Sequence, residues 1–343
     1  MTAPPDTAPR AATVPPEDIK AVPVRHPWRW VSVAVLGVLA AMLVNSIVTN
    51  DAYRWGTVGK YLFDQRLSRG ALVTLELTVI AMVLGVTLGV VLAVMRLSPN
   101  PILSSVAWVY LWVFRGTPVY TQLVFWGLIS VLYPRLGFGV PFGPEFASFQ
   151  TTQLITFFVA AVIGLSLNEA AYMAEIVRAG ILSVSEGQTE AAAALGMRRG
   201  HIMRRIVLPQ AMRVIIPPTG NELISMLKTT SLVIAVPLTT DLYSSAREIG
   251  IRLFQPLPLL ICAAIWYLAI TSVLMVGQYY LERHFARGSQ RSLPPTPLQK
   301  LRARLRGLRP PDAPGADAVP GARGPGGWTS FGGSRGEGEG DGR

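Results

Sequence analysis

The sequence predicts an all-α fold, a polytopic membrane helical bundle of about six transmembrane helices. Half of the 343 residues are hydrophobic and only 15% are charged, whereas a soluble protein carries about a quarter charged residues. Residues 31–48 and 257–281 contain no formal charge, and about twenty such residues span a bilayer as a helix. Because the hydrocarbon core offers no water to backbone groups, helices are the expected spanning form.

The apolar runs and their interruptions define the expected spans. The predicted spans are residues 30–48, 70–95, 102–132, 152–177, 214–237 and 257–281. The third is too long for one straight crossing and is interrupted by Arg115-Gly116-Thr117-Pro118. Proline and glycine free backbone groups, so we expect a break there that is buried in protein or lines a cavity. Residues 133–149 and 238–256 are predicted to be external loops.

The distribution of arginines predicts the orientation. The net charge of +11 lies at the flanks of the spans and in one tail, which indicates the positive-inside bias rather than a nucleic-acid-binding surface. The connection at residues 178–213 carries six arginines and is expected in the cytoplasm, so six spans return both termini there. The single cysteine, Cys262, lies in a span and is expected to be a small buried hydrophobe.

Both ends of the chain have the composition of tails. Residues 1–29 are rich in proline, alanine and threonine, without a signal peptide, and residues 283–343 are basic and then rich in glycine and proline. Both are expected to be disordered and cytoplasmic. Leucines recur at helical spacing in residues 298–309, which fits either a short amphipathic helix on the membrane surface or a solvated basic tail.

The arginine-rich connection contains a spaced motif. Its residues are Glu190, Ala191, Ala192, Gly196, Ile206, Leu208 and Pro209. Ser185-x-x-Gln188 predicts a capping box at the start of a helix, and Gly196 is expected to end that helix in the left-handed conformation. A second short helix is predicted at residues 201–207, with Pro209 marking the return to the membrane. The simplest alternative is a cytoplasmic helical hairpin that has no partner.

This motif resembles the EAA loop of bacterial ABC-importer permeases, in which it contacts the ATPase. Four further segments are similar to the polar amino-acid branch of that family, the histidine/glutamine/arginine type: residues 114–118, 167–172, 174–178 and 227–232. The similarity covers residues 69–282. Many relatives have Lys-Asp-Thr-Ser-Leu where this chain has Lys228-Thr229-Thr230-Ser231-Leu232, so a lysine–aspartate pair is not expected.

The resemblance implies a type I ABC-importer permease core at residues 70–282, with an additional first helix and external loop at 30–69. It implies a multi-pass subunit of the bacterial inner membrane for uptake of polar amino acids. Expected partners are a second permease subunit, identical or homologous, a cytoplasmic ATPase dimer, an extracytoplasmic binding protein and lipid. ATP and Mg belong on the ATPase. No catalytic, metal or cofactor site is expected here, and the chain has no GxxxxGK[ST] phosphate loop.

Charged and polar residues inside the spans are candidates for a translocation path. They are Arg115, Gly116, Thr117, Pro118, Asn168, Glu169 and Lys228. Asn168 and Glu169 are predicted to receive the cationic end of an amino acid, while Lys228 and the broken backbone receive its carboxylate. Structural roles remain open: a Glu169–Lys228 ion pair, and a packing clamp at Arg115.

Two other classes of function compete with an importer subunit. An ATP-independent carrier or channel for small polar solutes suits the intramembrane charges equally well, but it has no need of a docking loop. A haem-bearing enzyme would place histidines within the spans. The three histidines, His26, His201 and His284, lie outside the predicted spans or at their edges.

Overall fold

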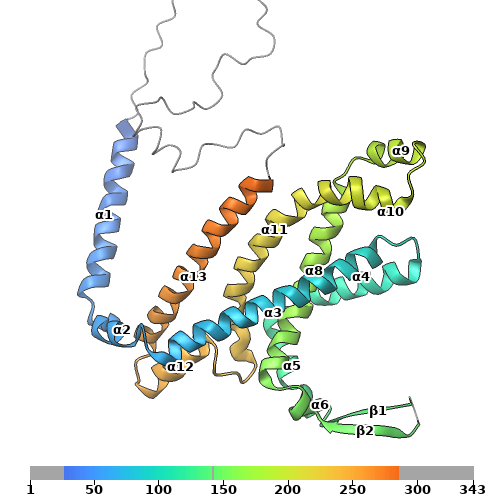
Figure 1. The fold of residues 1–343 in the computed structure, drawn as a ribbon. Helices are drawn as coiled ribbons and strands as arrows, with labels where there is room; N and C mark the ends of the chain where they lie inside the picture. The colour runs from blue at the N-terminus through green and yellow to red at the C-terminus, as the bar shows by residue number, and fades with distance from the viewer. Residues whose placement is uncertain (1–26, 141–142, 286–343) are drawn as a thin grey trace, which may run out of the picture. The chain divides into compact units, whose positions relative to one another are not determined.

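The computed structural model describes residues 27–140 and 143–285 (Figure 1). Helices dominate, which confirms the all-α prediction. Most of the two predicted tails, including a helix at residues 298–309, lies in residues 1–26 and 286–343, outside the described part. Residues 27–29 and 283–285, predicted to belong to the tails, instead form the ends of α1 and α13.

The long helices follow the order expected from the sequence. They are α1 (Pro27–Thr49), α3 (Gln65–Arg96), α4 (Pro101–Gly116), α5 (Val119–Gly127), α8 (Phe157–Leu182), α11 (Leu208–Thr229) and α13 (Pro256–Phe285). Four described helices are long and apolar enough to cross a membrane: α1, α3, α8 and α13. The pair α4 and α5, bent by 99° at its break, makes a fifth candidate. The helix α11 does not pass this test, because prolines and polar side chains lower its hydropathy.

Shorter elements fill the connections. They are η1 (Asp51–Tyr53), α2 (Trp55–Tyr61), α6 (Ile129–Leu132), α7 (Thr151–Leu154), α9 (Glu186–Ala194), α10 (Arg199–Ile202), η2 (Met203–Val207), η3 (Thr230–Ala235) and α12 (Leu242–Arg252). The two segments predicted to be external loops are more ordered than expected. One contains α12. The other forms an antiparallel hairpin of β1 (Arg135–Gly139) and β2 (Glu145–Gln150).

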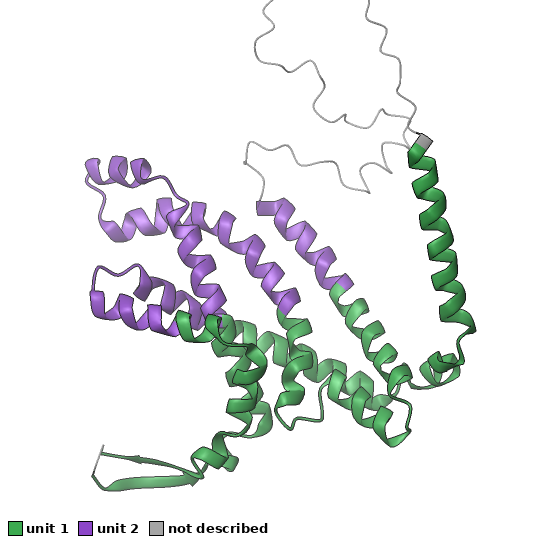
Figure 2. Cartoon of the chain, turned by 180° about the vertical axis from the view of Figure 1, so that it is seen from behind, with its two compact units in different colours: residues 1–85, 111–169, 226–271 green, residues 86–110, 170–225, 272–343 purple. Residues whose placement is uncertain are grey.

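The chain divides into two compact units (Figure 2). The first comprises Met1–Gly85, Leu111–Glu169 and Met226–Thr271, and the second comprises Val86–Tyr110, Ala170–Ser225 and Ser272–Arg343. Each boundary falls inside a long helix. The predicted division between an added segment at residues 30–69 and a permease core at residues 70–282 stays a prediction.

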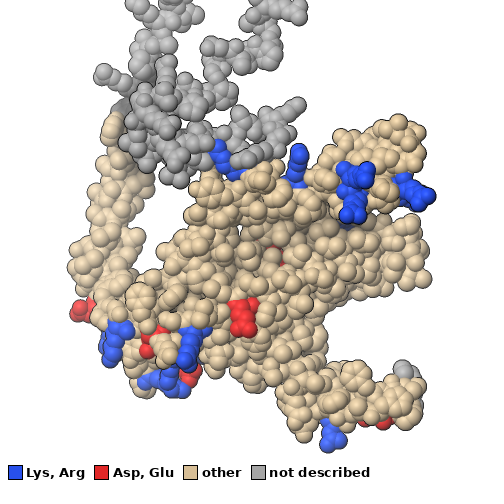
Figure 3. Space-filling model, in the orientation of Figure 1, with Lys and Arg blue, Asp and Glu red and all other residues tan. Residues whose placement is uncertain are grey.

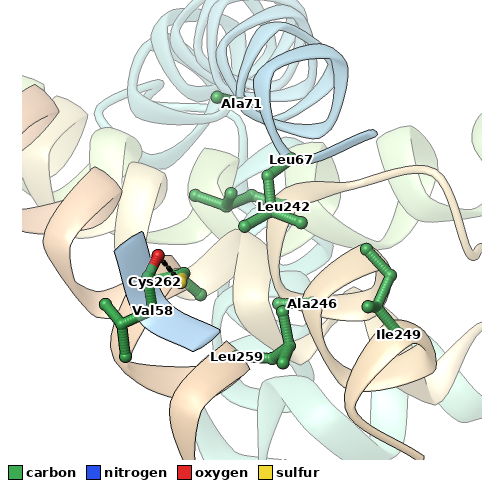
Figure 4. Packing of buried hydrophobic residues seen from close by; sticks show 9 residues of the cluster. Val58, Leu67, Ala71, Leu242, Ala246, Ile249, Leu259 and Cys262 are labelled. Atoms are coloured by element: carbon green, nitrogen blue, oxygen red, sulfur yellow. Dashed lines mark hydrogen bonds between the residues drawn. The ribbon is translucent and has the colours of Figure 1, made fainter. Parts of the chain in front are cut away.

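The core of the first unit lies where α2, the start of α3, α12 and the start of α13 meet (Figure 4). Leu67, Leu242 and Leu259 are fully buried there, and Leu67 and Leu242 point toward one another. Cys262 is buried among them, as predicted, and its thiol donates to the carbonyl oxygen of Val58 at 3.5 Å. The core joins segments about 200 residues apart in sequence, so it depends on the folded topology.

The short helix α2 is held on α13 by polar contacts as well. The indole nitrogen of Trp266 donates to the carbonyl oxygen of Leu62 at 2.7 Å, and the Thr57 hydroxyl donates to Gln255 Oε1 at 2.9 Å. By contrast, no residue in the apolar stretch of α1 is buried. Within the predicted N-terminal addition, α2 therefore belongs to the packed core and α1 presents its whole surface to its surroundings.

Two glycines of α3 allow α8 to approach closely. A Cβ added at Gly85 would lie 2.7 Å from Cγ of Glu169, and one added at Gly89 would lie 2.6 Å from Cβ of Met173. The spacing Gly85-x-x-x-Gly89 matches the small-residue pattern that brings membrane helices together. Met173 then packs with Ala93, Ala211 and Ile215 in the core of the second unit.

We expect Gly89→Ala to lower the melting temperature of the purified protein by several degrees. The added methyl group would meet Met173 Cβ and also backbone atoms of α8 at 3.0 Å, which cannot move without separating the helices. Gly37→Ala in α1 is the matched control, because a Cβ there meets nothing within 4 Å. Equal melting temperatures for the two variants, measured by intrinsic fluorescence in detergent, would contradict this packing.

The helix α12 begins at a buried N-cap. Asp241 is fully buried, and its Oδ2 accepts from the backbone N–H groups of Tyr243 and Ser244 at 3.1 and 3.2 Å. Burial raises the pKa of the Asp241 carboxyl above its usual value, although the two capping bonds act in the opposite direction. A raised pKa means that ionisation of this group costs stability in the folded state.

The raised pKa predicts a specific pH dependence. The contribution of Asp241 to stability is complete below the unfolded pKa of 3.8 and declines as pH rises through the folded pKa. Asp241→Asn keeps an N-cap acceptor and cannot ionise. We expect this variant to unfold at a higher temperature than the wild type at neutral pH, with the gap closing near pH 4. A gap that widens on acidification would show that the buried carboxylate is stabilised.

Candidate functional site

The arginine-rich connection is a compact helix–turn–helix. The helix α9 ends at Ala194, and Gly196, which follows the C-cap residue, has a φ of +77°, the predicted left-handed conformation. The N–H of Gly196 donates to the carbonyl oxygen of Ala193 at 2.9 Å, and the N–H of Met197 donates to that of Ala192 at 3.1 Å. These two bonds form a Schellman motif. The predicted turn at Gly196 is therefore confirmed.

The predicted capping box is wrong, although Ser185 does stand at the N-cap of α9. The Ser185 side chain makes no capping hydrogen bond. Gln188 instead accepts a hydrogen bond at its Oε1 from the amide of Gln210, at the start of α11. The side chain that would have capped α9 thus ties it to α11, a contact across 22 residues that local spacing does not reveal.

The second half of the connection is helical, as predicted, but continuous with α11. It begins as α10, passes through the π-helical turn η2 and enters α11 at Leu208. Pro209 has no N–H to donate within the first turn of α11. The wider π turn just before it fits this interruption, since such turns accommodate local breaks in the α-helical hydrogen-bond ladder. The chain therefore continues into α11 without a loop at Pro209.

The motif residues divide into a buried and an exposed set. Ala192 and Val207 are buried together with Ile202, and Ile206 and Met197 pack against them. Glu190, Ala191, Gly196, Leu208 and Pro209 are exposed. The buried set fixes the angle between α9 and α10. The exposed set leaves a surface that includes the small face of α9.

The most exposed apolar residue of this surface is one that was not predicted from the sequence. Leu195 is 84% exposed at the tip of the turn, beside Gly196. Figure 3 shows arginine side chains over the same α9 and α10 region. An apolar tip flanked by basic groups is the character expected of a docking surface.

The predicted break in the third span is present and is braced by amide side chains. The helix α4 ends at Gly116, and α5 begins after Pro118. The buried Gln122 amide donates to the carbonyl oxygens of Phe114 at 2.9 Å and Thr117 at 3.1 Å. The Thr117 hydroxyl donates to Val113 at 2.8 Å. Carbonyls freed by the break are thus satisfied inside the protein. Gln122, a lone amide in an apolar run, was not singled out from the sequence.

Asn168 and Glu169 occupy different environments. The Asn168 amide donates to the carbonyl oxygen of Phe114 at 3.2 Å and to Gln122 Oε1 at 3.1 Å, so it helps to hold the break. Glu169 is only 4% exposed and lies against Gly85. The structure therefore brings Asn168 to the Arg115–Pro118 region, as part of the bracing of the backbone, and buries Glu169 beside α3.

Lys228 lies at an open cleft of its own. It is exposed and lines a cleft of about 350 Å³ with Ser231, Tyr243 and Tyr267. Within the described residues Lys228 forms no ion pair, so the predicted alternative of a direct Glu169–Lys228 pair is absent from this structure. The cleft combines one cation with two phenol groups, an arrangement that can hold a carboxylate. The two tyrosines were not identified from the sequence.

Comparisons with known proteins place this architecture. The family described as binding-protein-dependent transport system inner membrane component matches residues 85–287. The arginine transport system permease protein ArgU of Corynebacterium glutamicum is 57% identical over 286 residues, 83% of this chain and 89% of that protein. The L-cystine permease protein TcyB and the arginine permease protein ArtQ of Bacillus subtilis are 39% and 37% identical, over 71% and 61% of this chain and 95% and 88% of their own lengths.

A solved structure agrees with these relatives. The crystal structure of an amino acid ABC transporter with histidines is 34% identical, with a TM-score of 0.53, and the match covers 64% of this chain and 94% of that one. The fold and the loop thus define a membrane component of a transport system. The chain belongs to the binding-protein-dependent transport system inner membrane component family, as a permease subunit of an amino-acid ABC importer. This identification decides against the ATP-independent carrier.

Proposed function

We propose that this chain is the permease of an importer for arginine. Support comes from the relative that is 57% identical over most of both chains and carries the name of an arginine permease. The intramembrane groups suit such a cargo. Glu169, in the family-like segment 167–172, supplies a carboxylate for the cationic side chain of arginine. The cleft of Lys228, Tyr243 and Tyr267 offers donors for the carboxylate of arginine. Arg115 and the backbone of residues 116–118 complete the proposed path.

We further propose that the α9–Gly196–α10 connection docks a separate ATPase. The observation that carries this proposal is the Schellman turn, which fixes two short helices around an exposed tip of Glu190, Ala191, Leu195 and Gly196. Alanines leave α9 thin enough to enter a groove on a partner. ATP and Mg would then be bound by that partner, and a second permease subunit and a binding protein would complete the importer.

The proposed orientation places this connection and both termini in the cytoplasm. Reporter fusions at residues 20 and 290 test it, and we expect cytoplasmic signals from both. The bent pair α4 and α5 makes the experiment informative, because a re-entrant pair would leave an odd number of crossings. Opposite signals from the two fusions would show that one of the six helices does not cross. Periplasmic signals from both would reverse the connection and remove the proposed docking role.

The proposed substrate is tested by uptake into proteoliposomes that contain the permease with its ATPase. With ATP inside and binding protein outside, we expect accumulation of labelled arginine. Excess unlabelled arginine should abolish this uptake, whereas excess glutamine or cystine should leave most of it. Accumulation of labelled cystine or glutamine, with no accumulation of labelled arginine, would assign a different amino acid. Uptake without ATP would overturn the importer mechanism itself.

A further inference from the structure

A basic cleft lies at the start of α3, apart from the proposed path residues. Its volume is about 450 Å³. Its lining comes from three segments: the first turns of α3, the irregular stretch before α12, and one face of α12. The lining residues are Arg66, Arg69, Val73, Thr239, Thr240, Ser245, Glu248, Ile249 and Arg252. All belong to the first unit.

Helical spacing explains why the charges converge. Arg66 and Arg69 are three residues apart on α3, and Glu248 and Arg252 are four apart on α12, so each pair shares a helix face. Arg252 pairs with Glu248. Arg66 and Arg69 are exposed and form no ion pair within the described residues. The cleft therefore keeps two uncompensated guanidinium groups beside the hydroxyls of Thr239 and Thr240. In Figure 3, basic side chains (blue) lie over α2 and α12 together with acidic side chains (red).

The length of α3 leaves room for this cleft outside the apolar layer. The helix has 32 residues and is about 48 Å long, whereas the hydrocarbon core is about 30 Å thick. Arg66 and Arg69 lie in its first two turns and can reach water. In the proposed orientation, this end of α3 faces the outside of the cell membrane.

We propose that this basic cleft is the docking site for acidic side chains of the extracytoplasmic binding protein. The inference rests on the proposed orientation, and the family description names transport that depends on a binding protein. Two planar guanidinium groups with neighbouring hydroxyls fit carboxylates, which they can bind in a bidentate manner. Arginine as cargo fits poorly, because its side chain would add a third guanidinium. The cleft therefore recognises the binding protein that delivers the amino acid.

The experiment measures affinity of the binding protein for the complete importer in nanodiscs. The probe is the amino-acid-binding protein that supports arginine uptake by the wild-type complex. We expect Arg66→Glu/Arg69→Glu to weaken its binding by about tenfold or more and to flatten the salt dependence, since exposed charge pairs are screened by salt. Arg247→Glu, on α12 but outside the cleft, is the control and should bind as the wild type does. Arg66→Gln/Arg69→Gln provides a milder second test if the double reversal lowers the melting temperature.

Other outcomes overturn the proposal. Unchanged affinity and salt dependence in both double variants would exclude this docking site, while wild-type arginine uptake would leave the proposed function intact. Loss of bound phosphatidylglycerol in the variants, with unchanged binding-protein affinity, would assign the cleft to lipid headgroups. An equal loss of binding-protein affinity in Arg247→Glu would show that the charge of the whole surface determines binding and that the cleft has no specific role. Absence of uptake by the wild type would instead refute the proposed function.

Discussion

Gly196→Val is expected to abolish most binding-protein-stimulated ATP hydrolysis while the permease still inserts in the membrane. Gly196 has a φ of +77°, which a β-branched residue strongly resists. Such backbone strain costs about 1–3 kcal/mol, enough to break the two hydrogen bonds of the Schellman turn. The second helix would then leave its angle to α9, and the exposed tip would no longer present one surface. We expect at least about a tenfold loss of stimulated activity, about 1.4 kcal/mol of coupling free energy.

Two matched variants separate conformation from bulk. Gly200 also lies in the connection with nothing within 4 Å of an added Cβ, but its backbone is helical. Gly200→Val should therefore retain most of the stimulated activity. Gly196→Asn should fall between the wild type and Gly196→Val, since asparagine tolerates the left-handed conformation. A similar loss in Gly200→Val and Gly196→Val would mean that side-chain volume matters at this surface, and the turn itself would lose its proposed importance.

Lys228→Met is expected to reduce arginine uptake by about tenfold or more without lowering the melting temperature. The Lys228 side chain is exposed and unpaired within the described residues, so its removal breaks no ion pair of the fold. The expected loss corresponds to about 1.4 kcal/mol of interaction with the substrate carboxylate. Lys60→Met is a suitable control, because Lys60 lies on α2 at a distance along the chain from the proposed path and is likewise exposed.

Glu169→Gln and the double variant Glu169→Gln/Lys228→Met complete the series. Glu169 is buried, so its exchange for an amide of the same shape is preferred to truncation. If the two side chains contact substrate independently, the double variant should transport less than either single variant. Recovery of expression and transport in the double variant would indicate a structural ion pair that forms in another conformation of the importer. That result would remove both residues from the proposed path.

The features of the site that could be predicted from the sequence are those set by residues close together in the chain. The turn at Gly196 and the break at residues 115–118 follow from glycine and proline, whose backbone preferences act within a few residues. The bracing of the break by Gln122 and Asn168 joins residues 46 apart, and the Gln188–Gln210 bond displaced the predicted capping box. Such contacts depend on the positions of whole helices, which hydrophobic pattern alone does not give.

The connections were predicted less well than the spans. The segment after α6 is rich in glycine and proline and was predicted to be a loop, yet Leu136 pairs with Phe149 and Phe138 with Ala147 in a hairpin. The alternation of apolar residues in this segment could have predicted a strand, but the alternating stretch is short. Similarly, α12 follows the buried cap Asp241, whose partners Tyr243 and Ser244 are local. That helix was predictable from its N-cap, whereas its burial against α3 was not.

Site-specific photo-crosslinking from Leu195 tests most directly whether the α9–Gly196–α10 connection couples this permease to an ATPase. A benzophenone amino acid placed at Leu195 puts the reactive group at the exposed tip, and the same group at Phe138 on the β1–β2 hairpin, which the proposed orientation places outside, is the control. In membranes containing the whole importer, we predict a covalent adduct with the ATPase subunit from position 195 and none from position 138. An ATPase adduct from position 138, or its absence from position 195 in an importer active in uptake, would contradict the proposed docking site.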